Sequence, residues 1–189
     1  MKASEVLTIA PSDPRWPRQL NERLTTTAPE HLWIIGNPGI LDKHKVGLFC
    51  SARCLEDAIV NAHTAARKFC QEEATMVSGF HSPTEKQCLR IFLEGKQSII
   101  ICLARSLARI RLPSEWQTAI DSGRLLLLSR FERSRRADKE TARRRNELVA
   151  ALADEVLIVH AEPGGAVERI SRLIDRWNLP RREVAQGEA

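Results

Sequence analysis

The segment Val77-Ser78-Gly79-Phe80-His81-Ser82-Pro83 contains the residue types of a phosphate-binding turn. An apolar run ends at the Ser-Gly pair, and Glu85 follows Ser82 by three residues. Ser-x-x-Glu is a capping box and proline fits the first turn of a helix, so the pattern predicts a strand that turns directly into a helix. A helix N-terminus offers backbone N–H groups and the positive end of its dipole to an anion. The alternative is an ordinary strand-to-helix turn, in which Glu85 only caps the helix and His81 is a turn residue.

A second feature is a concentration of positive charge. Residues 130–145 contain eight Lys/Arg and three Asp/Glu, a net +5 that equals the net charge of all 189 residues. The rest of the chain is formally neutral, and a basic segment beside a neutral domain indicates a polyanionic partner. We expect Arg143, Arg144 and Arg145 to contact phosphate groups. The alternative is a solvated loop and helix face.

Short apolar runs alternate with segments of helical periodicity. Runs such as IIICL, LLLL and VLIV are continuously apolar, as strands are when helices cover both faces of their sheet. The alternation predicts an α/β fold, with a doubly wound, mostly parallel, Rossmann-like sheet in a single domain. Strands are expected at 32–35, 46–50, 74–78, 98–103, 124–128 and 156–160, and helices at 55–69, 83–94, 114–121, 139–152 and 166–177.

Segments with weaker patterns flank this domain. We expect residues 1–30 to form an N-terminal arm, residues 31–179 the Rossmann-like domain and residues 180–189 a disordered tail. No apolar run is long enough to span a bilayer, and the first residues lack the apolar core of a signal peptide. We therefore expect no membrane contact.

The cysteines bear on location and on metal binding. Five cysteines without a Cys-x-x-Cys pair are typical of buried, reduced thiols and predict a cytoplasmic location. Their spacing matches no zinc site, so we expect no metal. Because the chain has neither a G-x-G-x-x-G motif nor a Walker A lysine, we also expect no cofactor.

In open α/β sheets, ligands bind at the carboxyl ends of the strands. The residues that follow the expected strands are mostly small ones, which let backbone N–H groups approach a phosphate, and arginines, which bind its oxygens in pairs. With the arginine-rich helix, the candidate phosphate- or nucleic-acid-binding residues are Ser51, Arg53, Ser78, Gly79, His81, Ser82, Arg105, Arg143, Arg144, Arg145, Asn146, Gly164 and Gly165.

These motifs, in this order, resemble those of the DNA-processing protein A (DprA/Smf) family over about residues 14–175. The Pro-x-x-Leu-x-x-x-Gly-Asn approach to that family's first strand is similar to residues 29–37, and its strand ending in Gly-Ser-Arg is similar to residues 49–53. Its Val-Ser-Gly-hydrophobe turn is similar to residues 77–80. Its Arg-Asn helix, which ends in Asp-x-hydrophobe, looks like residues 145–156.

The resemblance implies an extended Rossmann domain that binds single-stranded DNA in a basic pocket, transfers it to a recombinase and forms a homodimer. It therefore implies single-stranded DNA or a nucleotide as the ligand, and a recombination or DNA-processing protein as a partner. The family residues that match by motif are Arg53, Gly79, Arg145 and Asn146. No catalytic residue is expected.

The wider Rossmann-like group also contains lysine-decarboxylase-like nucleotide hydrolases, which offer an enzymatic alternative. Their Pro-Gly-Gly-x-Gly-Thr-x-x-Glu loop is partly similar to Pro163-Gly164-Gly165 followed by Glu168. An arginine that holds phosphate, with a carboxylate near the anomeric carbon, could cleave an N-glycosidic bond. A non-catalytic sensor of a nucleotide is a third hypothesis. The sequence leaves open whether the ligand is a polymer or a mononucleotide.

Overall fold

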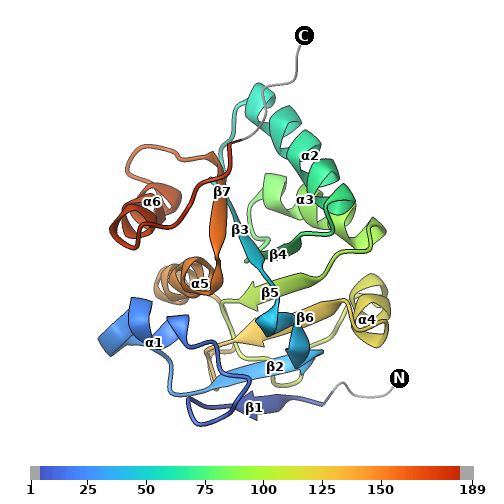
Figure 1. Ribbon diagram of the computed structural model, residues 1–189, viewed down its shortest axis with the longest axis vertical. Coiled ribbons are helices and arrows are strands. Elements are labelled where there is room, and N and C mark those ends of the chain that lie inside the picture. The colour runs from blue at the N-terminus through green and yellow to red at the C-terminus, as the bar shows by residue number, and fades with distance from the viewer. Residues whose placement is uncertain (1–4, 184–189) are drawn as a thin grey trace.

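The computed structural model describes residues 5–183 and has one sheet between two layers of helices (Figure 1). Each predicted strand or helix is present, and its ends lie within two residues of the expected ones. The strands are β1 (Leu7–Ile9), β2 (Leu32–Gly36), β3 (Lys45–Cys50), β4 (Thr75–Ser78), β5 (Ile99–Leu103), β6 (Leu125–Ser129) and β7 (Glu155–His160). The helices are α1 (Gln19–Leu24), α2 (Glu56–Gln71), α3 (Pro83–Glu94), α4 (Ser114–Asp121), α5 (Lys139–Leu152) and α6 (Ala166–Arg176), with short 3-10 turns at Thr25–Thr27 and Pro38–Asp42.

The strand order is β1-β2-β6-β5-β4-β3-β7. The five strands from β6 to β7 are parallel to one another, which confirms the predicted mostly parallel sheet. β2 runs antiparallel to β6, with Trp33 opposite Ser129, and β1 runs antiparallel to β2. This reversal brings the start of β2 to the edge at which the parallel strands end.

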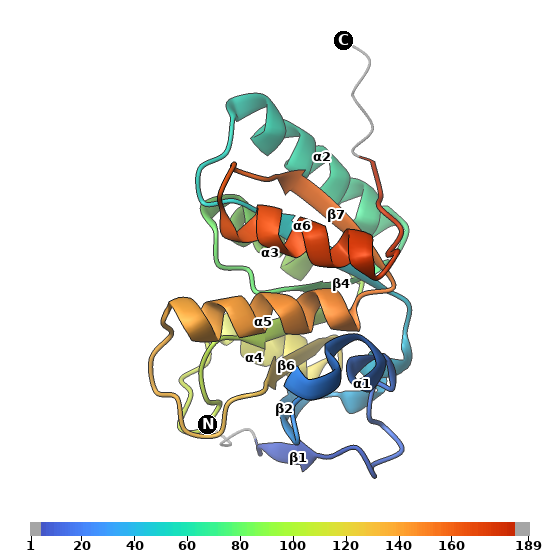
Figure 2. The ribbon, with the colours of Figure 1, turned by 90° about the vertical axis from the view of Figure 1, so that its left-hand side faces the viewer.

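The two helical layers explain the continuously apolar strands. Helices α1, α5 and α6 cover one face of the sheet, and α2, α3 and α4 cover the other (Figure 2). Along β5, Ile100 and Cys102 pack in the first layer, whereas Ile99 and Ile101 pack in the second. Successive side chains of a strand point to opposite faces, so both sets must be apolar. No helix among residues 5–183 is long and apolar enough to cross a membrane.

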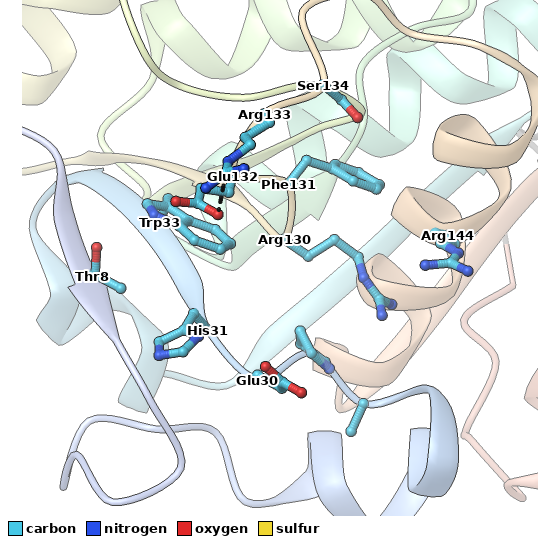
Figure 3. A pocket seen from close by; sticks show the side chains of 12 residues that line it. Thr8, Glu30, His31, Trp33, Arg130, Phe131, Glu132, Arg133, Ser134 and Arg144 are labelled. Atoms are coloured by element: carbon cyan, nitrogen blue, oxygen red, sulfur yellow. Dashed lines mark ion pairs between the residues drawn. The ribbon is translucent and has the colours of Figure 1, made fainter.

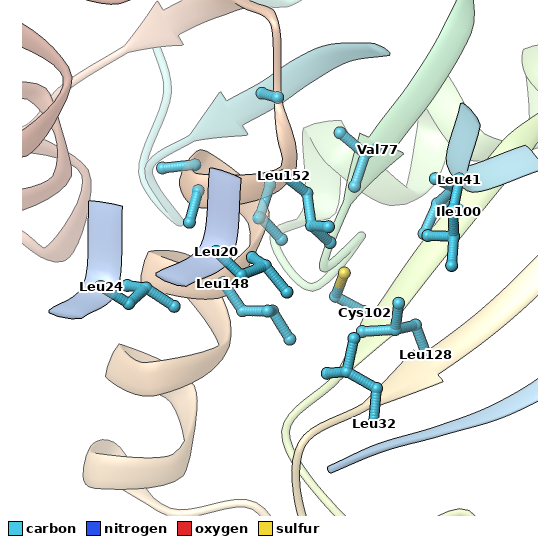
Figure 4. Packing of buried hydrophobic residues seen from close by; sticks show 14 of the residues in the cluster. Leu20, Leu24, Leu32, Leu41, Val77, Ile100, Cys102, Leu128, Leu148 and Leu152 are labelled. Carbon is cyan, nitrogen blue, oxygen red and sulfur yellow. The ribbon is translucent and has the colours of Figure 1, made fainter. Parts of the chain in front are cut away.

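Residues of the expected N-terminal arm pack into this architecture. Leu20 and Leu24 of α1 lie in the same cluster as Leu148 and Leu152 of α5 (Figure 4). Arg23 donates from Nη1 to the carbonyl oxygens of residues 151 and 153, at 3.0 and 2.6 Å. These are carbonyls at the end of α5 that lack partners within the helix. The segment thus closes the end of α5, while its three-residue β1 extends the sheet.

The expected disordered tail begins with residues that are hydrogen bonded to β7. The N–H of Val156 donates to the Pro180 carbonyl at 2.9 Å, and the N–H of Arg182 donates to the Val156 carbonyl at 2.8 Å. The Arg182 guanidinium pairs with Glu72 and Glu155 and lies 5.3 Å from the centre of the Phe69 ring. Residues 180–182 are therefore held against the edge of the sheet, and 184–189 lie outside the described residues.

Candidate functional site at the carboxyl edge

The parallel topology brings the strand-following residues to one edge of the sheet. The loops after β3, β4, β5, β6 and β7 all start there, and the candidate residues lie in these loops or at the start of α3 and on α5. In Figure 2 this edge is on the left, where the loops that precede α5 and α6 lie. The structure therefore places Arg53 and Gly79 at the same edge, in the loops after two neighbouring strands.

The turn after β4 is closed by its own carboxylate. Ser82 and Glu85 form the expected capping box at the start of α3. The Glu85 carboxylate also accepts the N–H of Cys50 at 3.0 Å and that of His81 at 2.8 Å, as well as the N–H of Ser82 at 3.2 Å. It thereby joins the ends of β3 and β4. The expectation of free N–H groups at this turn is wrong, because a buried glutamate already fills the anion site.

The glycine loop after β7 is occupied in the same way. The N–H of Gly164 donates to Glu168 Oε2 at 2.7 Å, and that of Gly165 donates to the Glu162 carbonyl at 2.9 Å. Glu162 also approaches the exposed Arg53 guanidinium, with 3.7 Å between Oε1 and Nη1. Both N–H groups are thus already hydrogen bonded within the protein. The prediction that Gly164 and Gly165 offer free N–H groups to a phosphate is therefore also wrong.

The three candidate serines hold the loops together. Ser51 Oγ accepts the N–H of Glu162 at 2.9 Å. Ser78 Oγ donates to the Leu48 carbonyl at 2.8 Å and accepts the N–H of Phe80 at 3.2 Å. Ser82 Oγ accepts the N–H of Glu85 at 3.2 Å. These hydroxyls, which the sequence suggested as ligand contacts, are engaged within the protein.

A buried guanidinium lies against Gly79. Arg145 is only 6% exposed, and its Nε donates to Asn146 Oδ1 at 2.7 Å. Burial lowers the pKa of Arg145, and the Glu85 carboxylate partly opposes this effect. A Cβ at residue 79 would lie 2.0 Å from Arg145 Nη1, so only glycine leaves room for this side chain. Left-handed backbone occurs one residue later, at Phe80 (φ 45°).

The three consecutive arginines of α5 do not form one cluster. Arg143 pairs with Glu140 and Glu147 on its own helix. Arg144 also pairs with Glu140, at 2.8 Å, and lines a different hollow from that of Arg145. Successive helical residues are about 100° apart, so three in a row cannot face one ligand. The interpretation of Arg143 as a phosphate contact is not supported by these pairs.

Three hollows follow one another along the edge. The inner hollow, of about 350 Å³, contains Gly79, His81, Arg105 and Arg145, with Trp116 on its wall. The middle hollow, of about 560 Å³, shares Arg105 with it. The outer hollow, of about 720 Å³, shares Glu132 and Arg133 with the middle one (Figure 3). We call the three together the edge groove.

The edge groove is strongly basic. Its acidic lining residues are Glu30, Glu115 and Glu132. Its basic ones are Lys86, Arg90, Arg105, Arg109, Arg130, Arg133, Arg135, Arg144 and Arg145. Of these, Arg105, Arg144 and Arg145 are among the candidate residues, and Arg130, Arg133 and Arg135 belong to the basic segment 130–145 that the sequence indicates. The others lie in long loops or on the outer face of α3, and the outer hollow depends on the reversal of β2, which the sequence does not reveal.

The cysteines provide no metal site. Among residues 5–183, no group of three His, Cys, Asp or Glu side chains is placed to hold a metal ion. All five cysteines are free thiols. Burial raises the pKa of Cys50, Cys88 and Cys102 to about 12, which keeps them protonated at neutral pH.

Comparisons with known proteins place this fold. Its structure is similar to DNA processing protein A from Helicobacter pylori (22% identity, TM-score 0.76, covering 94% of this chain and 80% of that one) and from Streptococcus pneumoniae (20% identity, TM-score 0.72, covering 89% and 60%). It is less similar to a molybdenum cofactor binding protein from Rippkaea orientalis (11% identity, TM-score 0.52, covering 74% of each chain). No curated protein matches the sequence. The family model described as DNA recombination-mediator protein A matches residues 7–172, so the chain belongs to that family.

Proposed function

We propose that this protein binds single-stranded DNA along the edge groove and acts in DNA processing. The observation that carries the proposal is the continuity of the groove, in which each hollow shares a basic residue with the next. A mononucleotide needs one closed pocket, whereas a row of basic hollows matches the repeated phosphates of a strand. The Helicobacter pylori protein with this fold binds single-stranded DNA, which supports the same ligand class here.

The carboxylates at the carboxyl edge, Glu85 and Glu168, support binding over hydrolysis. Glu85 is buried and accepts three backbone N–H groups. Glu168 accepts the N–H of Gly164 and pairs with Arg172. A general base must reach the proton that it removes, and both side chains are already engaged in helix capping. The nucleotide hydrolase is therefore not favoured, and the nucleotide sensor becomes an outcome of the binding test.

The partner and the location are further parts of the proposal. We also propose a homodimer and a recombination or DNA-processing partner; the description of the matching family as a DNA recombination mediator supports the second. Light scattering of the purified chain would establish whether it dimerises. A cytoplasmic location agrees with five free thiols, which persist in reducing compartments.

The proposal is tested by titrating single-stranded DNA, duplex DNA, RNA and a mononucleotide across a salt series. Each neutralised phosphate of a single strand contributes about −0.7 to the slope of log affinity against log salt. Arg105→Gln and Arg133→Gln change exposed residues that are each shared by two hollows, so each should flatten the slope by about that amount.

Arg176→Gln is the charge-matched control. Arg176 is exposed at the end of α6, on the edge opposite to the groove, and the variant should bind like the wild type. Tight saturable binding of the mononucleotide without binding of single-stranded DNA at low salt would replace the proposal with a nucleotide sensor. Equal slopes for all three variants would show that the groove does not contact the strand.

A further inference from the structure

The outer hollow contains a guanidinium with an unused donor. Arg130 follows β6 and donates from Nη2 to the Thr27 carbonyl at 2.5 Å. Its Nη1 is buried and has no hydrogen-bond partner among the described residues. It also forms no ion pair within residues 5–183, and its partly buried charge is only partly offset by the more distant carboxylates of Glu147 and Glu140. A buried, unsatisfied donor on a charged group is costly, so an anionic oxygen at this point would stabilise the protein.

A second guanidinium strengthens the positive field in the same hollow. Arg144 is exposed on α5 and pairs with Glu140 through its Nε. Figure 3 shows the guanidinium groups of Arg130 and Arg144 on the same side of the hollow. Burial lowers the pKa of Arg130, and repulsion by the charge of Arg144 lowers it further in the free protein. One phosphate group facing both would remove that repulsion.

Aromatic side chains form the other part of the wall. Trp33 of β2 is partly exposed, and its ring centre lies 5.9 Å from that of His31. The partly exposed Phe131 ring lies above the Arg130 side chain in Figure 3, and Trp33 lies across the hollow from it. Of the two acidic side chains in this hollow, Glu132 approaches Arg133 at 3.5 Å. Aromatic faces beside guanidinium groups bind a flat, aromatic group joined to an anion.

We propose that the outer hollow binds one nucleotide unit, with its phosphate facing Arg130 and Arg144 and its base stacked on Trp33 or Phe131. The site is separate from the Gly79–Arg145 contact, which lies in the inner hollow. A free nucleotide has the same phosphate and base as a nucleotide of a DNA strand. The assignment of the bound unit to a strand therefore rests on the proposed function. Bound in a strand, it would make the outer hollow the base-stacking end of the edge groove.

Intrinsic fluorescence tests the site directly, because Trp33 lies in the outer hollow and Trp116 in the inner one. The probes are an oligothymidylate and thymidine monophosphate. We expect the oligothymidylate to quench Trp33, so that Trp33→Phe loses a part of the quenching that Trp116→Phe retains. Arg130→Gln and Arg144→Gln should each weaken binding about tenfold, as loss of a charge-assisted hydrogen bond does. Arg176→Gln should bind normally, and thermal unfolding confirms that each variant is folded.

The outcomes separate this inference from the proposed function. If the oligothymidylate binds but Arg130→Gln and Arg144→Gln bind like Arg176→Gln, the outer site is refuted and the edge groove stands. If only thymidine monophosphate binds, and both variants weaken it, the outer site stands with a free nucleotide and the proposed function fails. If neither probe binds, both are refuted.

Discussion

The Arg145 side chain lies directly against the backbone of Gly79, where a methyl group would be 2.0 Å from Nη1 and 2.3 Å from Cζ. Residue 79 does not have the positive φ that would by itself require glycine. The need for glycine therefore comes from the guanidinium, which must pass over the turn after β4 to reach the inner hollow.

Gly79→Ala should displace this guanidinium while leaving the turn intact. We expect single-stranded DNA binding to weaken about tenfold, as it should in Arg145→Gln. Both changes act on one contact. The Gly79→Ala/Arg145→Gln double variant should therefore bind single-stranded DNA no more weakly than whichever single variant binds it less tightly. A binding titration of the three variants measures this, and unchanged binding by Gly79→Ala would remove Arg145 from the interface.

Removal of the Glu85 carboxylate should destabilise the edge and create an anion site. In Glu85→Ala the N–H groups of Cys50, His81 and Ser82 lose their acceptor. The Cys50 and Ser82 donors are buried, and each orphaned buried donor costs about 1–3 kcal/mol, so we expect the free energy of unfolding to fall by about 2 kcal/mol or more. Added phosphate should raise the Tm of this variant more than that of the wild type, because it replaces the missing carboxylate.

Glu85→Gln is the control for that experiment, since its remaining amide oxygen still accepts hydrogen bonds. We expect its stability to lie between those of the wild type and Glu85→Ala. A Glu85→Ala protein as stable as the wild type would show that the three N–H groups find water instead.

Arg143 and Arg144 should have different roles although they are neighbours. Arg143→Ala leaves the nearly buried Glu147 carboxylate without its partner, so we expect the free energy of unfolding to fall by about 1–2 kcal/mol. Affinity for single-stranded DNA should stay within about twofold of the wild-type value. Urea unfolding and a DNA titration measure the two effects. A large loss of affinity, equal to that of Arg144→Gln, would restore Arg143 as a phosphate contact.

The start of α5 should be sensitive to acid. Hydrogen bonds from Arg143 and Arg144 lower the pKa of the Glu140 carboxyl from 4.5 to about 2. A carboxyl whose pKa is lower in the folded state contributes stability that is fully present above pH 4.5 and is lost as the pH falls through about 2. The urea midpoint of Glu140→Gln should therefore fall less than that of the wild type in this window.

Glu94→Gln, at the end of α3, is the matched control because Glu94 forms no ion pair among the described residues. Its pH profile should be parallel to that of the wild type. If the pH profile of Glu140→Gln is also parallel to that of the wild type, the ion pairs at the start of α5 do not contribute to stability.

The sequence predicts the sheet well because its periodicity is strong. Runs such as Ile99–Leu103 can be buried on both sides only between two helical layers. The capping box at Ser82 also identifies the start of α3. The same Glu85 nevertheless closes the anion site that the capping box suggested, because a sequence pattern does not show where a carboxylate's second oxygen points.

The candidate site is predicted less completely, for two physical reasons. The three arginines at 143–145 must diverge around the helix, so local charge density does not translate into one binding face. The direction of β2 is also hidden, since a strand buried on both faces has the same composition whether it is parallel or antiparallel. Trp33, at the start of that strand, consequently has no sequence signal that links it to Arg130.

The reversed pairing of β2 with β6 has a consequence for the order of folding. Trp33 pairs with Ser129, and Arg23 reaches carbonyls 128 and 130 residues away on α5 and just after it. The segment from β1 to β2, whose two strands can pair with each other, therefore completes its remaining contacts only after β6 and α5 have been made. The parallel sheet and the inner hollow can form before this docking, whereas the outer hollow cannot. The nucleotide site proposed there would be the last part of the surface to assemble and the first to open when the N-terminal segment detaches.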